Sequence, residues 1–192
     1  MSAQSHDRQR SWAASRLKRV LSDNPQRPAA IVIRSDGESQ TYSADDLNYL
    51  AEEVRADLES LLSSIRTSAR TGVVTFPARN DAVTLARVIA CVSAGLSFLP
   101  VDPKAYAREW PRIRDATRAR GHCIDLERKQ VHETEAADWR APDCLMMSGG
   151  STGKPHLVST DMLGQSERPV PNLLYRETLW RSGQVQLSLG PL

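Results

Sequence analysis

The sequence has little net charge and no long apolar run. Its 192 residues include 25 lysines and arginines against 23 aspartates and glutamates, a formal net charge of +2. So small an excess does not favour a nucleic-acid-binding protein. No apolar stretch has the length of a signal peptide core or a membrane span. We therefore expect a cytoplasmic protein that binds neither nucleic acid nor membrane.

Cysteine is also scarce. Cys91, Cys123 and Cys144 are odd in number and widely spaced, with no Cys-x-x-Cys pair. Such a pattern indicates neither a disulfide framework nor a zinc site, and it fits a reducing compartment. The four histidines are scattered as well, so no shared metal site is predicted. Cys91 and Cys144 stand among apolar residues and are interpreted as core positions, with no catalytic role.

What is present is the composition of a globular protein, in which apolar periodicities alternate between those of helices and strands. The patterns predict a helix at 7–21, a strand at 29–33 with a hairpin partner at 40–42, a helix at 47–65, a strand at 72–76, a helix at 81–94, a strand at 96–101 and a helix through 110–116. Ser43, followed by Asp45 and Asp46, is typical of a helix N-cap. This alternation predicts an α/β fold with a largely parallel sheet flanked by helices.

The second half of the chain carries two local features. Arginine is dense between 108 and 120, which could bind an acidic partner, although a solvated helix face is the favoured interpretation. Residues 143–147 predict a strand that leads into a glycine-rich segment, with 156–159 as its hairpin partner. Further on, a helix is expected at 173–180 and a strand at 184–189.

The glycine-rich segment, residues 148–154, is the strongest chemical signal. It consists of Ser148, Gly149, Gly150, Ser151, Thr152, Gly153 and Lys154. Glycines allow the backbone amides to approach an anion closely, and the hydroxyls and the lysine add donors and positive charge, so the composition suits polyphosphate. A ligand-free Gly/Ser turn is the alternative. The phosphate loop of common nucleotide hydrolases is disfavoured, because it has a wider glycine spacing and a Ser or Thr where Pro155 follows the lysine.

The segment, together with Pro155, resembles the phosphate-binding signature of adenylate-forming enzymes, the superfamily of acyl-CoA synthetases, peptide-synthetase adenylation domains and luciferases. Its Ser-Gly-Gly-Ser opening is most similar to the aryl-acid and acyl-CoA ligase branches. His156 departs from the lysine or arginine usual after the proline. Thr41-Tyr42 and residues 94–103 resemble two other recurring regions of the family, in the same order, so the resemblance spans 29–192.

The resemblance implies a protein that activates a carboxylic acid as an acyl-adenylate with ATP and Mg²⁺, and then passes the acyl group to a thiol acceptor. We expect 1–28 to be a helical extension and 29–192 to be a partial AMP-binding domain, truncated before most of the active site. Incomplete sheet coverage would then favour self-association through an exposed sheet edge. The alternative is a non-catalytic binding or regulatory remnant of the fold. No residue is assigned a catalytic role, and no metal ligand is assigned.

Overall fold

The computed structural model describes residues 14–15, 17–34, 36–65, 72–134, 144–148 and 156–159, with only the backbone of Ser148 and His156. Of the helix predicted at 7–21, residues 14–15 and 17–21 are described, and they are helical. The helix expected at 173–180 and the strand expected at 184–189 lie outside the described residues. Within the described part, no helix combines the length and the apolar character needed to cross a membrane.

The predicted N-terminal hairpin is confirmed, and it leads directly into the longest helix. β1 (Pro28–Ile33) and β2 (Ser39–Ser43) pair antiparallel, and α2 (Ala44–Ser63) follows. Ser43 is the N-cap, as predicted. The Asp46 N–H donates to Ser43 Oγ over 3.1 Å, and the Ser43 N–H donates to Asp46 Oδ2 over 2.8 Å. This reciprocal capping box fixes where α2 begins.

The central sheet has the strand order β4-β3-β5-β6. Its strands are β3 (Gly72–Pro77), β4 (Ser97–Val101), β5 (His122–Asp125) and β6 (Gln130–His132). The first three are parallel and β6 is antiparallel to β5, which confirms the largely parallel α/β sheet. β5 and β6 were not predicted. Each is only three or four residues long and begins and ends with a polar residue, so neither shows an apolar periodicity.

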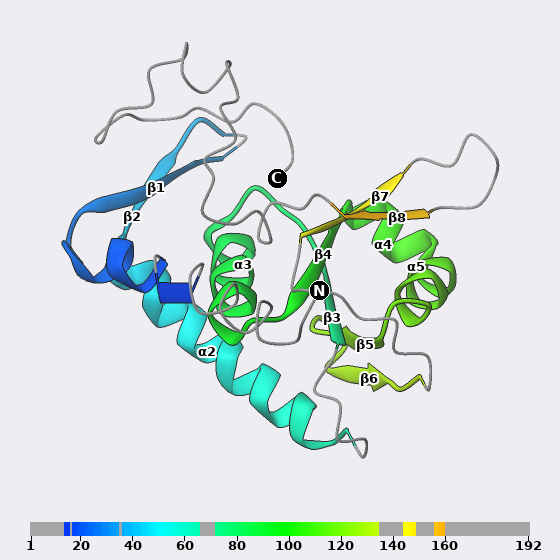
Figure 1. Cartoon of the computed structure of the whole chain (residues 1–192). Coiled ribbons are helices and arrows are strands. Elements are labelled where there is room, and N and C mark those ends of the chain that lie inside the picture. The colour runs from blue at the N-terminus through cyan, green and yellow to red at the C-terminus, as the bar shows by residue number, and fades with distance from the viewer. Residues whose placement is uncertain are drawn as a thin grey trace, which may run out of the picture.

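Helices cover both faces of this sheet (Figure 1). On one face, α2 and α3 (Ala82–Ala94) bury a cluster that includes Val74, Phe76, Phe98 and Ile124. On the other face, α4 (Pro103–Arg108) and α5 (Trp110–Arg118) cover Val73, Leu99 and Val101. Burying both faces of a parallel sheet in this way makes three layers from helix, sheet and helix.

Two further helices start where an aspartate side chain caps them. Asp81 caps α3, and Gly95 ends it in a left-handed conformation with φ of 64°. Asp102 caps α4, with Pro103 at the first helical position. The single helix expected through 110–116 is preceded by this additional helix α4, and the chain bends between the two at Glu109. Asp102 and Pro103 therefore begin a helix as well as ending a strand.

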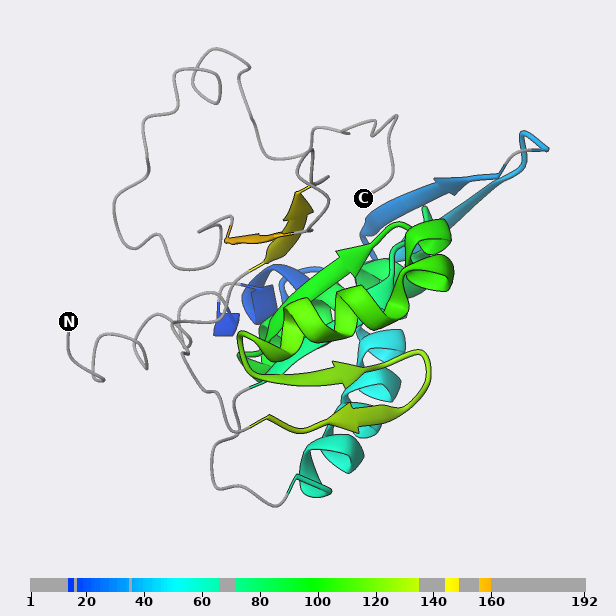
Figure 2. The ribbon, with the colours of Figure 1, turned by 90° about the vertical axis from the view of Figure 1, so that its right-hand side faces the viewer.

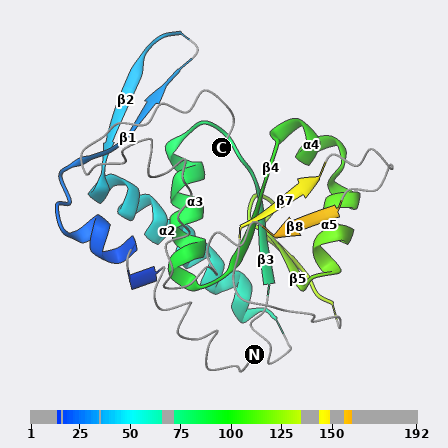
Figure 3. The same cartoon turned by 45° about the horizontal axis from the view of Figure 1, so that its top comes forward.

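A second hairpin, β7 (Leu145–Ser148) with β8 (His156–Ser159), confirms the predicted pair beside the glycine-rich segment. A parallel bridge joins Cys144, just before β7, to Phe98 of β4. The hairpin lies between β4 and the helices α4 and α5 (Figure 3), and Leu145 and Leu157 are buried with Tyr106 and Ile113. The hairpin thus continues the covered side of the central sheet.

The two hairpins also expose apolar side chains. Ile31 and Ile33 on the β1–β2 hairpin, which projects away from the other described elements (Figure 2), are 52% and 59% exposed. Met146 and Val158, cross-strand neighbours in the other hairpin, are 54% and 48% exposed. Self-association through such surfaces remains a prediction.

The packing of α2 against the sheet can be tested at Leu58, which is 1% exposed within the α2/α3 cluster. Replacing Leu58 by alanine should lower the free energy of unfolding by about 2 to 5 kcal/mol, because it removes buried methyl groups and leaves a cavity. Tyr49→Ala is the matched control on the same helix, since Tyr49 is 67% exposed and should change stability by less than about 0.5 kcal/mol. Urea denaturation measures both; equal effects would contradict this packing.

Candidate functional site

The carboxyl ends of β3, β4 and β5 lie along one edge of the sheet. The register pairs Pro77 with Val101, so β3 and β4 finish at the same level, and it pairs Thr75 with Asp125, so β5 ends two residues before β3 does. In open α/β sheets, ligands bind in the crevice outside these ends. We call this boundary the carboxyl edge.

The strand that precedes the glycine-rich segment runs in the same direction. Since the Phe98–Cys144 bridge is parallel, β7 runs with β4 toward the carboxyl edge. Ser148 is the last residue of β7 and pairs with His156, the first residue of β8, so the segment begins and the chain returns at one paired position. Of the predicted site residues, only the Ser148 backbone is placed. Gly149, Gly150, Ser151, Thr152, Gly153 and Lys154 lie outside the described residues, and their role stays a prediction.

Two aspartates at the carboxyl edge are occupied by capping. Asp81 Oδ1 accepts the Thr84 N–H over 2.7 Å. Asp102 Oδ1 accepts the N–H groups of Lys104 and Ala105, both over 2.9 Å. These carboxylates satisfy backbone donors that would otherwise have no partner in the first turn. They therefore serve to position α3 and α4 rather than to transfer protons.

At the same edge, ion pairs of Glu127 link the end of β5 to α3 and to the residues after β3. Glu127 Oε2 accepts from Arg87 over 2.6 Å, and Glu127 Oε1 accepts from Arg79 over 3.4 Å. The Arg87 guanidinium also reaches the Pro77 carbonyl at 3.4 Å. Partial burial alone would raise the pKa of Glu127, but the hydrogen bonds and charges of Arg87 and Arg79 outweigh it and lower the pKa below its ordinary value.

A third group lies at the end of β5, where Asp125 is fully buried. The Tyr106 hydroxyl of α4 donates to Asp125 Oδ1 in a short hydrogen bond, and the Arg128 N–H donates to the same oxygen over 3.0 Å. The Arg128 guanidinium donates to Oδ2 over 3.0 Å. Burial and the hydrogen bond to Asp125 raise the pKa of the Tyr106 hydroxyl. This hydroxyl thus remains a proton donor at neutral pH.

The same arginine stacks on aromatic rings of the covering helices. The guanidinium carbon of Arg128 is 4.5 Å from the ring centroid of Tyr106 and 4.5 Å from that of Trp110. Cation–π contact adds to the ion pair with Asp125, so α4, α5 and the β5–β6 turn are held by one guanidinium.

Sequence reasoning missed both of these groups. Tyr106 lies 19 residues from Asp125, and Arg87 lies 40 residues from Glu127, so no local motif links the partners. The available signal was weak: Asp125 and Glu127 occur where the short strand β5 ends, and β5 itself was not predicted. A carboxylate at the end of a parallel strand is a reason to search for partners on the covering helices.

Two of the cysteines are buried in the fold. Cys91 is fully buried in the α2/α3 cluster, as predicted, and burial raises the pKa of its thiol. Burial also raises the pKa of Cys123 to about 11. Among the described residues, no group of three or more His, Cys, Asp or Glu side chains is arranged to hold a metal ion.

Comparison with known proteins identifies the fold. No family model matches the sequence, and no curated protein matches it by sequence. The N-terminal subdomain of NpsA from Klebsiella oxytoca matches with a TM-score of 0.52 and 16% identity, covering 76% of this chain and 41% of that chain. McyG A-PCP complexed with phenylalanyl-adenylate matches with a TM-score of 0.52 and 14% identity, covering 76% and 28%. An artificially fused adenylation-PCP di-domain of NpsA and ThdA, also from Klebsiella oxytoca, matches with a TM-score of 0.52 and 16% identity, covering 77% and 32%.

The fold is therefore that of the N-terminal part of an adenylate-forming enzyme. This confirms the fold class and the resemblance inferred from the glycine-rich segment and the two earlier regions. The chain spans less than half the length of each of these matched chains. At such low identity the likeness establishes the fold, and any activity remains a matter for proposal.

The buried Asp125 group predicts a stability cost at Tyr106. Tyr106→Phe removes the hydroxyl donor and leaves one carboxylate oxygen of Asp125 with a single donor, so the free energy of unfolding should fall by about 1.5 to 3 kcal/mol. Tyr49→Phe, at an exposed position, is the control and should have no measurable effect. Chemical denaturation at neutral pH compares the two. Unchanged stability in Tyr106→Phe would show that the hydroxyl does not support the buried carboxylate.

The Glu127 group predicts a pH-dependent contribution. Because the pKa of folded Glu127 is below its ordinary value of 4.5, its ionised form stabilises the fold above that pH, and the contribution disappears as pH falls through the folded pKa. Glu127→Gln should cost about 0.5 to 1 kcal/mol at pH 7, and the difference from wild type should vanish in acid.

Glu38→Gln is the control for this series, because Glu38 faces Arg34 at 3.7 Å in a well-exposed pair. Its effect should be close to zero at every pH. Stability is measured by denaturation from neutral to acidic pH. A Glu127→Gln deficit that persists unchanged in acid would contradict the ion-pair origin of the effect.

Proposed function

We propose that this chain forms the N-terminal part of an acid–AMP ligase-like protein and that its glycine-rich segment holds the phosphates of ATP. The observation that carries the proposal is the hairpin β7–β8, which opens at Ser148 and His156 in a fold shared with adenylating proteins. In this proposal, residues 29–192 contribute to the AMP-binding domain, and residues 1–28 form an extension before it.

The chemistry of the segment suits this role. Three glycines allow its amides to converge on an anion, Ser151 and Thr152 offer hydroxyl donors, and Lys154 adds a positive charge. Such donors would hold the β- and γ-phosphates while a carboxylate attacks the α-phosphorus, so the contribution to catalysis is positioning and charge stabilisation. A bound Mg²⁺ would neutralise phosphate charge. The carboxylates of Asp81 and Asp102, which follow β3 and β4, cap helices, so we assign neither of them to the metal.

The substrate class follows from the same proposal. McyG A-PCP is complexed with phenylalanyl-adenylate, an acid joined to AMP, and the fused NpsA-ThdA protein couples adenylation to a PCP. We extend both features to this protein as expectations, namely a carboxylic acid substrate and a thiol acceptor.

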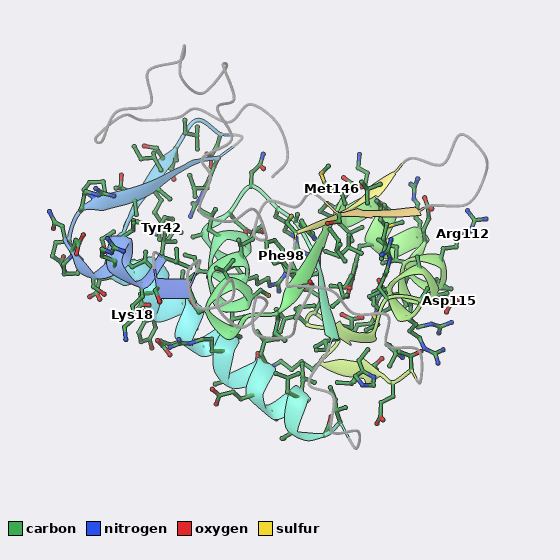
Figure 4. All side chains as sticks on the ribbon, viewed as in Figure 1. Lys18, Tyr42, Phe98, Arg112, Asp115 and Met146 are labelled. Carbon is green, nitrogen blue, oxygen red and sulfur yellow. The ribbon has the colours of Figure 1, made fainter. Side chains whose placement is uncertain are left out.

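The proposal predicts phosphate-directed binding. The chain should bind both ATP and inorganic triphosphate, and Lys154→Ala should weaken each by roughly tenfold or more, because the lost hydrogen bond is to a charged group. Lys18→Ala, at an exposed lysine far from β7, is the control and should bind as wild type does (Figure 4). Calorimetry and phosphorus NMR measure the affinities. Binding of ATP without triphosphate, or equal losses in both variants, would contradict the role of the segment.

Catalysis is tested separately, by carboxylate-dependent exchange of labelled pyrophosphate into ATP. Exchange that is lost in Lys154→Ala would support an acid ligase. Because the chain is proposed to be only a part of the ligase, the chain by itself should bind phosphate without exchange. A chain extended by the remainder of the AMP-binding domain should exchange with an acid if the protein is a ligase, and should not if it is the alternative, a binding module that retains the fold.

A further inference from the structure

The helices α4 and α5 and the two residues after them form a short stretch with a net positive charge. Residues 103–120 contain six cations and only two carboxylates, a net charge of +4. The remainder of the chain has 19 cations and 21 carboxylates, a net charge of −2. The cations, which we call the α4–α5 basic face, are Lys104, Arg108, Arg112, Arg114, Arg118 and Arg120. All are exposed except Arg114, which is partly buried.

Helix stability does not explain this arrangement. Cations stabilise the last turn of a helix, which accounts for Arg108 and Arg118. Lys104 and Arg112 instead lie in the first turns of α4 and α5, where positive charge opposes the helix dipole, although Arg112 also lies 3.9 Å from the carboxylate of Glu109, the N-cap residue of α5. Arg114 and Arg118 are also like charges one turn apart, a spacing that destabilises a helix.

Two of the arginines are held in place by groups that leave their charge intact. Arg118 Nε donates to the Glu133 carbonyl over 3.1 Å, and the Arg120 guanidinium donates to the Leu157 carbonyl over 3.3 Å. A carbonyl oxygen orients a guanidinium without neutralising it. Figure 4 shows Arg112 and Asp115 on the side of α5 that points away from the sheet. Arg112 and Arg114 lie 3.9 Å and 2.9 Å from the carboxylates of Glu109 and Asp115, so their charge is partly offset, and the stretch keeps its net positive charge through the other cations.

The pKa of a neighbouring histidine, His132, is lowered by burial and by the arginines of α5. His132 of β6 lies against Trp110, with ring centroids 5.9 Å apart. Burial lowers the pKa of His132, and Arg114, Arg118 and Arg128 lower it further, while Asp125 opposes them. His132 is thus a built-in reporter of the potential at this flank of α5.

We propose that the α4–α5 basic face is a docking surface for a protein partner that presents clustered carboxylates. A protein is favoured over a nucleic acid because Glu109 and Asp115 lie among the cations and would repel a continuous phosphate backbone. The aromatic side chain within this stretch that is nearest the surface, Trp110, is packed on Tyr106 and Arg128 and does not offer a ring for base stacking. The exposure of five of the six cations agrees with the solvated helix face expected from sequence, and the docking role is proposed in addition to it.

The test uses oligoglutamate as the acidic probe, with oligoglutamine of the same length and single-stranded DNA of the same charge as comparisons. The chain should bind oligoglutamate in a salt-sensitive manner and should not bind oligoglutamine. The variant Lys104→Gln with Arg108→Gln and Arg112→Gln should bind it roughly tenfold more weakly, because three exposed charge contacts are lost. The pKa of His132, followed by NMR, should rise when oligoglutamate binds, because the bound carboxylates offset the arginines.

The matched control is Lys18→Gln with Arg19→Gln and Arg27→Gln, which removes the same charge from exposed positions elsewhere; Lys18 and Arg112 lie on opposite sides of the molecule in Figure 4. Its affinity should fall by less than about twofold. The proposal is overturned if the two triple variants lose the same affinity, if DNA binds more tightly than oligoglutamate, or if His132 does not respond to the peptide.

Discussion

The described fold depends on one buried carboxyl group, that of Asp125. It has no access to solvent at the end of β5, and an unpaired buried carboxylate would cost several kcal/mol. Its three donors come from different parts of the chain: the hydroxyl of Tyr106 on α4, and the amide and the guanidinium of Arg128 in the turn before β6. The folded state therefore needs sheet, helix and turn in place together. These hydrogen bonds also hold the end of β5 at the carboxyl edge, because Asp125 is the last residue of that strand.

The first half of the fold could be predicted from sequence because its signals are local. Ser43 and Asp46 cap α2 across one helical turn, and the apolar runs of β3 and β4 are bounded by turn residues. β5, β6 and α4 could not be predicted in the same way. β5 is a strand because it pairs with β3 and buries Ile124, so its cause is tertiary. A strand of four residues is too short to show an apolar periodicity. α4 was hidden because Asp102 and Pro103 signal the end of a strand and the start of a helix equally well.

The candidate site likewise has a part that could be predicted from sequence and a part that could not. The residue types of the glycine-rich segment indicate phosphate chemistry without any structure, and the register of β7 and β8 adds that the segment starts and returns at one point beside β4. The ionic and hydrogen-bonded groups around Glu127 and Asp125 are invisible to motif reasoning, since their partners are brought together only by the parallel sheet and its covering helices. Chemistry carried by one short segment can be predicted, whereas chemistry assembled across layers requires the fold.

The basic face and the carboxyl edge are two sides of the same short helix. α4 places Lys104 and Arg108 outward, while Tyr106 between them is buried and bonded to Asp125. α5 follows at once, and its Trp110 packs on the guanidinium that completes the Asp125 group. A partner bound to the outer cations would thus contact the element whose inner side is fixed to the end of β5.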